Sequence, residues 1–448
     1  MAEAALTELA GIVGESQCTA AASEREFFAV DGLTPGCVVY PDSAEQAAQT
    51  LEWAAGRDLA VIACGGATKL GIGNSPRKYD IALCTRNITK VDYYEPSDLT
   101  AGVGAGMALT DFQKQLKPDG LWLPLDLPGC AKGTLGGVVA TNASGPLRHF
   151  YGAPRDMVVG MQIATPEGKL IRTGGRVVKN VAGYDLGKLM IGSYGTLGVI
   201  TEVNLKLFPL PAECQTFVLS VGTLDIARDL RRRILALPIE LLRMVLLDAE
   251  MAGIAHPGLQ PGRPACGPQI WLEAGGSKSV IDRTRKELEA VSRAAGAKFH
   301  SCEWEASEKV WKMISDFANW FGKTYPGAVV LKGTMPIAHG EEFQSFAQQE
   351  AQNEKIKLVV VSLPGVGMLE LGLLGLQNAA QAAGFVSRIR KVAEESGGAL
   401  TVISATAEVK ALVDVWGGPE TTFELMRKLK AAWDPEGVLA PGRFVGSI

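Results

Sequence analysis

The sequence predicts an α+β protein with more than one domain, and three observations support this. The chain has 448 residues, more than a single hydrophobic core usually supports. Up to Pro211, short apolar strands alternate with helices and with glycine-rich turns. Beyond Pro211 such turns become rarer, and the order strand–helix–strand–strand–helix–strand occurs twice. That order predicts an antiparallel sheet with helices on one face.

The composition is that of a folded soluble protein, with 47% hydrophobic and 21% charged residues. The 44 basic and 48 acidic residues are spread without blocks, which argues against a nucleic-acid-binding face. No run of about 18 or more apolar residues occurs, so the chain is not expected to span a membrane. Because Glu3 and Glu8 precede any apolar core, no signal peptide is expected either. The eight cysteines form no C-x-x-C pair, which predicts neither a zinc nor an iron–sulfur site and fits the cytoplasm.

The first elements are a helix and a lead-in over residues 1–33, followed by a strand from Val38. Asp42 or Ser43 is expected to cap the next helix, with Gln46 near its third position. A second strand then runs into a turn, CGGATKLGIG, at residues 64–73. Such a turn after an apolar strand often holds phosphates, but its spacing matches neither the Rossmann nor the P-loop motif.

The densest glycine run is GTLGGVVATNASGPLRHFYGAPRD, at residues 133–156. Glycine lets the main chain approach a ligand closely, and the interspersed Thr, Asn and Ser add short donors. The residues alone leave two interpretations open, a backbone cradle for a phosphate compound or a set of tight turns.

Further elements follow in order. A hairpin is expected around Pro166, and the alternation from Gly198 to Leu207 predicts a half-buried strand. Pro209 and Pro211 indicate a domain boundary. Helices are then predicted over 224–235, 279–295, 340–353 and 381–396. The aromatic segment 311–323 between the two halves is interpreted as a linker helix, with core packing as the first expectation for its aromatic side chains and a subunit interface as the second.

Taken together, the motifs resemble the FAD-binding oxidoreductases of the vanillyl-alcohol-oxidase (PCMH) type. The matching stretches are PDSAEQ, GGATKLG, the glycine run extended by MVVG, GGRVVKNVAGYDLGKLMIGSYGTLGVITEV and WDPEGVLAPGRFVG. They cover roughly residues 34–211 and 425–448. Within the family, ATNASGP, KNVAGYDL, VDVWG and LAPGRF look most like the FAD-binding E-type subunit of glycolate oxidase.

The resemblance implies a VAO/PCMH-type FAD-binding domain of two α+β subdomains at residues 34–211, after the lead-in at 1–33. It implies an α+β cap domain at 212–410, built on an antiparallel sheet with helices in two possible βαββαβ halves. Residues 411–448 would return to the FAD domain. The cofactor residues carried over by motif are Gly65, Gly66, Ala67, Thr68, Lys69, Leu70, Gly133, Thr134, Leu135, Gly136, Gly137, Asn142, Ser144, Gly145, Tyr151, Gly152, Arg155, Asp156, Gly195, Gly198, Val199, Ile200 and Arg443.

FAD is expected to be bound non-covalently. Many relatives attach it through a histidine after the paired glycines, where this chain has Ala67. Cys130 stands near the place of a flavin-linked cysteine in some relatives, but a small apolar filler is the preferred interpretation.

No catalytic or metal-binding residue is assigned. Relatives that oxidise 2-hydroxy acids resemble one another in a His-rich metal motif, whereas His149, His256, His300 and His339 lie in no such motif. Arg172, Arg176 and Lys179 could face a carboxylate substrate or the flavin, or could be solvated loop charges, and both interpretations stay open.

The resemblance implies a FAD-dependent oxidoreductase acting on CH–OH donors, as the FAD-binding subunit of a glycolate oxidase (dehydrogenase) complex in glyoxylate metabolism. It would work with a homologous catalytic flavoprotein subunit and with an iron–sulfur subunit that takes electrons from the flavin. Any membrane attachment, at the inner face, would be indirect and through these partners. The alternatives are a stand-alone dehydrogenase for a 2-hydroxy acid such as D-lactate, and a flavin-bearing subunit without catalytic function.

Overall fold

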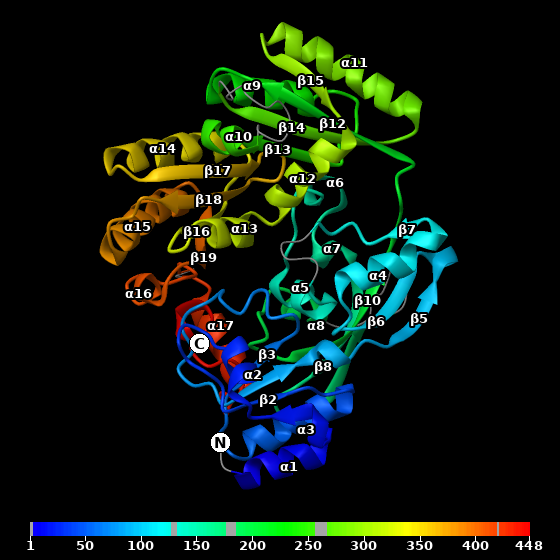
Figure 1. Cartoon of the computed structure of the whole chain (residues 1–448), viewed down its shortest axis with the longest axis vertical. Helices are drawn as coiled ribbons and strands as arrows, with labels where there is room; N and C mark the ends of the chain where they lie inside the picture. The colour runs from blue at the N-terminus through cyan, green and yellow to red at the C-terminus, as the bar shows by residue number, and fades with distance from the viewer. Residues whose placement is uncertain (1–2, 127–131, 176–184, 256–266, 419–420) are drawn as a thin grey trace. The chain divides into compact units, whose positions relative to one another are not determined.

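A computed structural model describes residues 3–126, 132–175, 185–255, 267–418 and 421–448 (Figure 1). The chain forms two compact units. Unit 1 comprises Met1–Ala143, Ala153–Leu210 and Asp414–Ile448, and unit 2 comprises Ser144–Gly152 and Pro211–Val413. The segment Ser144–Gly152, from the middle of the glycine run, therefore belongs to the same unit as the predicted cap.

Unit 1 begins with a four-stranded sheet in the order β1-β2-β4-β3. Its strands are β1 (Cys18–Thr19), β2 (Cys37–Val39), β4 (Ile81–Cys84) and β3 (Val61–Cys64). The last three are parallel and β1 is antiparallel. Helices α1 (Glu3–Val13) and α3 (Ala44–Ala55) pack their apolar residues against it, and α2 (Ala22–Phe27) follows β1. Ser43 is the N-cap of α3, since its hydroxyl accepts a hydrogen bond from the Gln46 N–H.

The second sheet of unit 1 is antiparallel throughout, in the order β5-β6-β10-β8-β9. The strands are β5 (Val91–Glu95), β6 (Thr100–Gly104), β10 (Val199–Lys206), β8 (Val158–Ala164) and β9 (Leu170–Gly174). The helices of this part are α4 (Leu109–Leu116), α5 (Leu135–Thr141), α7 (Pro154–Met157) and α8 (Leu186–Met190), and β7 (Leu121–Trp122) pairs with β11 (Phe208–Pro209).

Two predictions for this sheet have different outcomes. The hairpin around Pro166 is confirmed, because β8 and β9 pair from Ala164 and Leu170 outwards. The prediction that residues 198–207 form a half-buried strand is wrong, since β10 is buried on both faces and also buries polar residues such as Thr201 and Asn204. The reason is its central place in the sheet, with α5 and α3 packed near it.

The C-terminal segment completes unit 1. Helix α17 (Phe423–Trp433) leads to a return strand beside β3. There Val61 N–H donates to the Val438 carbonyl at 2.8 Å, and Ala440 N–H donates to the Val61 carbonyl at 2.9 Å. The last residues of the chain thereby lie against the strand that ends in the first glycine turn.

Unit 2 is built on one eight-stranded antiparallel sheet in the order β15-β12-β14-β13-β17-β18-β16-β19. The first half contains β12 (Glu213–Ser220), α9 (Leu224–Leu235), β13 (Arg243–Leu247), α10 (Ala249–Ala255), β14 (Gln269–Gly276), α11 (Lys278–Ala294) and β15 (Lys298–Cys302). The second contains β16 (Val329–Thr334), α14 (Gly340–Asn353), β17 (Lys357–Leu363), β18 (Met368–Leu374), α15 (Ala379–Glu395) and β19 (Ala399–Ser404). Short helices α6 (Arg148–Tyr151) and α16 (Ala407–Lys410) also belong to this unit.

The two halves meet where β13 pairs with β17, through Leu246↔Ser362 and Leu247↔Val361. On the helical side, Arg231 of α9 and Glu341 of α14 form a buried ion pair. Both contacts join equivalent elements, because β13 and β17 are the second strands and α9 and α14 the first helices of their halves.

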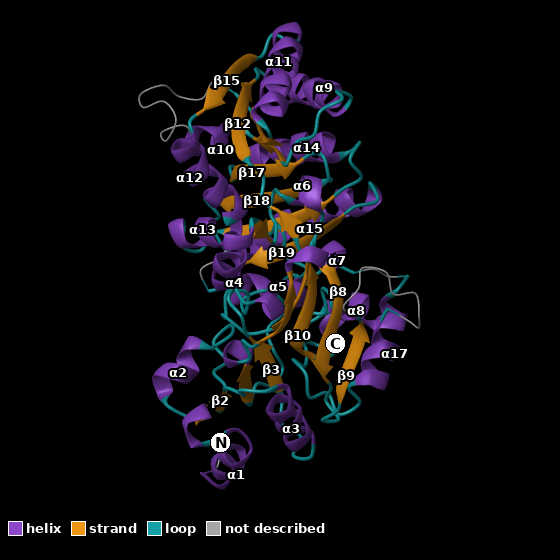
Figure 2. Ribbon diagram, turned by 90° about the vertical axis from the view of Figure 1, so that its right-hand side faces the viewer, coloured by secondary structure: helices purple, strands orange, loops and turns teal. Residues whose placement is uncertain are grey.

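Helices cover both faces of this sheet, so the expectation of one helical face is wrong (Figure 2). In β12, Phe217 and Leu219 face α9 and α11, whereas Val218 faces α10, α12 (Trp304–Ser315) and α13 (Phe317–Thr324). The aromatic segment supplies this second layer, with Trp311, Phe317 and Phe321 buried, so the expected core packing is confirmed.

Candidate functional site

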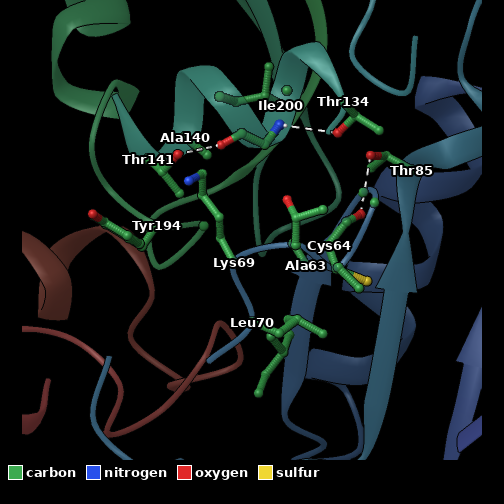
Figure 3. Close-up of a pocket in the computed structure, with 18 of the residues that line it drawn as sticks. Ala63, Cys64, Lys69, Leu70, Thr85, Thr134, Ala140, Thr141, Tyr194 and Ile200 are labelled. Carbon is green, nitrogen blue, oxygen red and sulfur yellow. Dashed lines mark hydrogen bonds between the residues drawn. The ribbon is translucent and has the colours of Figure 1, made fainter. Parts of the chain in front are cut away.

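A cavity lies where the two sheets of unit 1 and the C-terminal segment meet (Figure 3). The empty space inside it, including the open mouth, is about 980 Å³. The lining residues are Ile62, Ala63, Cys64, Gly65, Gly66, Ala67, Thr68, Lys69, Leu70, Ile72, Thr85, Gly133, Thr134, Gly136, Gly137, Val138, Ala140, Thr141, Tyr194, Gly195, Gly198, Val199, Ile200, Trp416, Ala440 and Arg443.

The turn after β3 presents backbone donors to the cavity. Within the described ranges, the N–H groups of Gly66, Ala67 and Thr68 have no hydrogen-bond acceptor. Ala67 has φ 57°, in the left-handed region that non-glycine residues rarely adopt. Successive N–H groups around a left-handed residue form a concave nest that binds anions. The turn therefore suits a phosphate.

Glycines let this turn pack against the start of the second glycine run. A Cβ on Gly66 would lie 1.5 Å from the Lys132 carbonyl oxygen, and one on Gly65 would lie 1.9 Å from Thr134 Oγ1. On the other wall, a Cβ on Gly136 would lie 2.7 Å from that of Ala105. The cavity walls hence come together only because these positions have no side chain.

Threonine hydroxyls fix the second wall. Thr134 is the N-cap of α5, and its Oγ1 accepts a hydrogen bond from Gly137 N–H at 3.3 Å. Thr141 Oγ1 donates to the Gly137 carbonyl at 2.8 Å (Figure 3). At the end of β4, Thr85 Oγ1 donates to the Cys64 carbonyl at 3.2 Å. The polar lining groups are thus held in place by the backbone around them.

The third wall combines Tyr194 with the C-terminal segment. The Tyr194 ring lies edge-on to Trp416 with centroids 4.7 Å apart. Trp416 Nε1 donates to the Arg443 carbonyl at 2.8 Å, and the Arg443 guanidinium donates to the carbonyls of Leu70 and Ile72. Burial raises the pKa of Tyr194 to about 12, so its phenol stays protonated at neutral pH. Arg443 thereby closes the first glycine turn from the far end of the chain.

The charge of the lining fits a dinucleotide with a pyrophosphate. Lys69 and Arg443 are basic, and no Asp, Glu or His is among the described lining residues. No group of three metal-ligating side chains occurs in the described part of the chain. A backbone nest, two cations and close-packed glycines are the features that hold FAD phosphates and admit a flat ring system.

The cavity collects many of the sequence-predicted cofactor residues. Those that line it are Gly65, Gly66, Ala67, Thr68, Lys69, Leu70, Gly133, Thr134, Gly136, Gly137, Gly195, Gly198, Val199, Ile200 and Arg443.

The other predicted residues lie outside the lining. Leu135 is buried on α5, and Asn142 ends that helix in a left-handed conformation. Arg155 donates its N–H to Asn142 Oδ1, and Asp156 accepts from the Ala153 N–H, so both brace the loop. The remaining four, Ser144, Gly145, Tyr151 and Gly152, belong to unit 2.

Several singled-out residues receive no role in the cavity. Arg172 pairs with Glu202 at 3.3 Å and is largely exposed, as expected of a solvated charge. Arg176, Lys179, Cys130 and His256 lie outside the described residues.

Sequence reasoning missed Cys64, Thr85 and Tyr194 as lining residues. A signal existed for Tyr194, which precedes Gly195 in SYGTLG and has φ 54°. Trp416 stands in VDVWG, a stretch noticed for its resemblance but given no role. Thr85 carried no local signal, because only the pairing of β3 with β4 brings it to the cavity.

Comparisons with known proteins agree with this site. Residues 35–174 match the family model "FAD binding domain", and residues 210–444 match "FAD linked oxidases, C-terminal domain". Glycolate oxidase subunit GlcD of Bacillus subtilis is 26% identical, over 92% of this chain and 89% of its own length. Glycolate oxidase subunit GlcE of Escherichia coli is 28% identical, over 82% of this chain and 86% of its own length. A D-lactate dehydrogenase of Archaeoglobus fulgidus is 26% identical, over 92% of this chain and 91% of its own length.

Solved structures show the same fold. An alkyldihydroxyacetonephosphate synthase matches with a TM-score of 0.78 at 17% identity, over 99% of this chain and 86% of its own. p-Cresol methylhydroxylase matches with a TM-score of 0.75 at 15% identity, over 98% of this chain and 96% of its own. The fold is therefore of the VAO/PCMH type, FAD is the cofactor, and the chain belongs to the family of FAD-linked oxidases.

Proposed function

We propose that this chain is the FAD-binding subunit of a glycolate oxidase complex that oxidises a 2-hydroxy acid to the 2-oxo acid. Its similarity to two different subunits of glycolate oxidases supports the substrate class. The observation that carries the proposal is the cavity of unit 1, where the described N–H groups of Gly66, Ala67 and Thr68 are left for a ligand.

The residues of this chain have distinct tasks in such a reaction. FAD, when bound, supplies the two-electron acceptor for oxidation of the alcohol carbon. The nest at Gly66–Thr68 binds phosphate oxygens, and Arg443 holds the turn in shape. Apolar residues such as Ile62 and Val199 exclude water from the rest of the cavity.

A proton acceptor for the substrate hydroxyl is not among these residues. The described lining has no carboxylate or imidazole, and the Tyr194 phenol is protonated at neutral pH. The base would thus come from residues outside this cavity. Unit 2 of this chain or a homologous catalytic flavoprotein subunit would supply it, and an iron–sulfur subunit would take up the electrons.

Anaerobic reduction of the purified FAD-loaded chain tests the proposal. Glycolate, D-lactate and D-2-hydroxyglutarate are added separately, and bleaching of the visible flavin absorbance is followed. We expect slow or no bleaching of the isolated chain, and full bleaching with glycolate once the partner subunits are added. Rapid bleaching of the isolated chain by D-lactate would instead support a stand-alone dehydrogenase, since relatives include D-lactate dehydrogenases.

A non-catalytic flavin subunit makes a different prediction. A complex that carries Gly66→Ala, assembles, lacks FAD in this chain and still turns over at the wild-type rate would favour that role. We expect turnover to be lost.

A further inference from the structure

Two cysteines stand next to each other on paired strands beside the cavity of unit 1, and one of them, Cys64, lines it. Cys64 ends β3, Cys84 ends β4, and they are register partners in the parallel ladder. Register partners point to the same face of a sheet, and neighbouring strands lie about 4.7–4.9 Å apart. A disulfide needs Cα atoms about 4.4–6.8 Å apart, so the backbone already holds this pair within bonding range.

Polar contacts prepare the pair for reaction. Cys64 Sγ donates to the Leu83 carbonyl at 3.6 Å, and Cys84 Sγ donates to the Gly65 carbonyl at 3.2 Å. Arg86 Nε donates to Cys84 Sγ at 3.2 Å, with its guanidinium held 4.8 Å from the centre of the Tyr40 ring.

Access to the pair runs through the cavity. Cys84 is fully buried, whereas Cys64 is partly exposed and lines the cavity (Figure 3). A small oxidant therefore meets Cys64 first, and a cofactor in the cavity covers that path. We propose that Cys64 and Cys84 form a reversible dithiol–disulfide site, oxidised by hydroperoxides while the cavity lacks FAD, whose disulfide weakens FAD binding.

The oxidation balances with hydrogen peroxide as the oxidant. Cys64 gives its proton to solvent, and its thiolate attacks one oxygen of the peroxide. The O–O bond breaks, and hydroxide leaves and becomes water, with a sulfenic acid on Cys64. Cys84 sulfur then attacks Cys64 sulfur, the S–O bond breaks, and a second water leaves. The net change is two thiols and one peroxide to one disulfide and two waters, and an added thiol reverses it.

The effect on FAD follows from the Gly65 carbonyl. In the dithiol, Cys84 donates to this carbonyl at the start of the turn whose N–H groups form the nest. The disulfide has no S–H, so this restraint on the turn is lost. A single lost hydrogen bond corresponds to roughly threefold to tenfold weaker FAD binding.

A second cysteine pair in the same sheet serves as an internal control. Cys18 of β1 and Cys37 of β2 lie on neighbouring paired strands, and neither lines the cavity. FAD should therefore not change how fast this pair reacts.

Peroxide treatment of the full chain tests the proposal, with and without FAD. Disulfides are mapped in unreduced peptides by mass spectrometry, and FAD affinity is measured by flavin fluorescence. We expect the Cys64–Cys84 disulfide to form at least about tenfold faster in the apo protein, with no FAD effect on Cys18–Cys37. The oxidised apo protein should bind FAD about threefold to tenfold more weakly until dithiothreitol restores it.

Variants separate the disulfide from general damage. Peroxide should no longer change the FAD affinity of Cys84→Ser or Cys64→Ser, whereas Cys214→Ser in unit 2 should respond as the wild type does. Equal oxidation rates with and without FAD, no Cys64–Cys84 disulfide, or an oxidised protein with unchanged FAD affinity would each overturn the proposal. All these readouts are independent of substrate and turnover, so they do not depend on the function proposed above.

Discussion

Lys430 and Asp434 form a buried ion pair one helical turn apart, with Nζ 2.6 Å from Oδ2. The same ammonium donates to the carbonyls of Thr196 at 2.7 Å and Leu439 at 2.8 Å. Asp434 in turn accepts from the N–H groups of Val438 and Leu439. Because Thr196 follows Gly195 and Leu439 precedes Ala440, the pair fastens two walls of the flavin cavity to the end of α17.

Lys430→Met should therefore destabilise unit 1. It leaves the Asp434 carboxylate buried without its partner, at a cost of about 3–5 kcal/mol. Urea unfolding followed by circular dichroism measures the loss. Lys428→Met is the control, since Lys428 is exposed and 3.7 Å from Glu424 and should cost less than about 1 kcal/mol. Equal effects of the two variants would show that the pair does not fasten the cavity walls.

Gly66→Ala should abolish FAD binding. The added Cβ would lie 1.5 Å from the Lys132 carbonyl oxygen, so the turn and its N–H groups must move. Gly71→Ala is a matched control in the same turn, because a Cβ added there would meet no atom within 4 Å. Titration with FAD after a check of folding by circular dichroism compares them. Wild-type affinity in a folded Gly66→Ala protein would contradict the assignment of this turn to the phosphates.

Arg443→Lys should weaken FAD binding despite the retained charge. The Arg443 guanidinium reaches both the Leu70 and the Ile72 carbonyl, which a lysine ammonium cannot span in the same way. Loss of one charged hydrogen bond, about 1.5–3 kcal/mol, corresponds to an affinity lower by roughly tenfold to a hundredfold. Flavin fluorescence gives the affinity, and Arg427→Lys on the exposed face of α17 should leave it unchanged.

The stability of unit 2 should depend on pH through Asp248. Burial raises the pKa of this carboxyl to about 6, against hydrogen bonds from Met251 N–H and Gln348 Nε2. At pH values between the ordinary pKa of 3.8 and the raised pKa of about 6, the folded state binds more protons than the unfolded state. Stability is then greatest below this window and falls as pH rises through it, by about 3 kcal/mol.

Asp248→Asn removes the titrating group and isolates this contribution. The difference in unfolding free energy between wild type and variant should shift in favour of the variant from pH 4 to pH 7. Urea unfolding at several pH values gives this difference. A difference that is independent of pH would contradict the raised pKa.

The sequence was informative where a local signal and the tertiary structure agree. The predicted helices 224–235 and 340–353 coincide with α9 and α14, and Thr223 caps the former through its side chain. The glycine turn was recognisable because Gly66 is required by a close backbone approach.

Other features depend on contacts between distant residues and left no local pattern. Thr85 reaches the cavity only through strand pairing. The second helical face of the unit 2 sheet was not expected, because the periodicity of a strand does not tell which helix covers which face. A Cβ on Gly372 of β18 would lie 2.4 Å from Phe321, a contact that only the folded unit reveals.

The pairing of β13 with β17 has a consequence for how unit 2 can be divided. The second strand of each half pairs with the equivalent strand of the other half. An ion pair between Arg231 and Glu341 links the first helices of the two halves. This is the relationship of an isologous dimer contained within one chain. Produced separately, either half would expose an unpaired strand edge that could accept the same strand from another copy and lead to aggregation. Joining the halves in one polypeptide keeps that edge permanently covered.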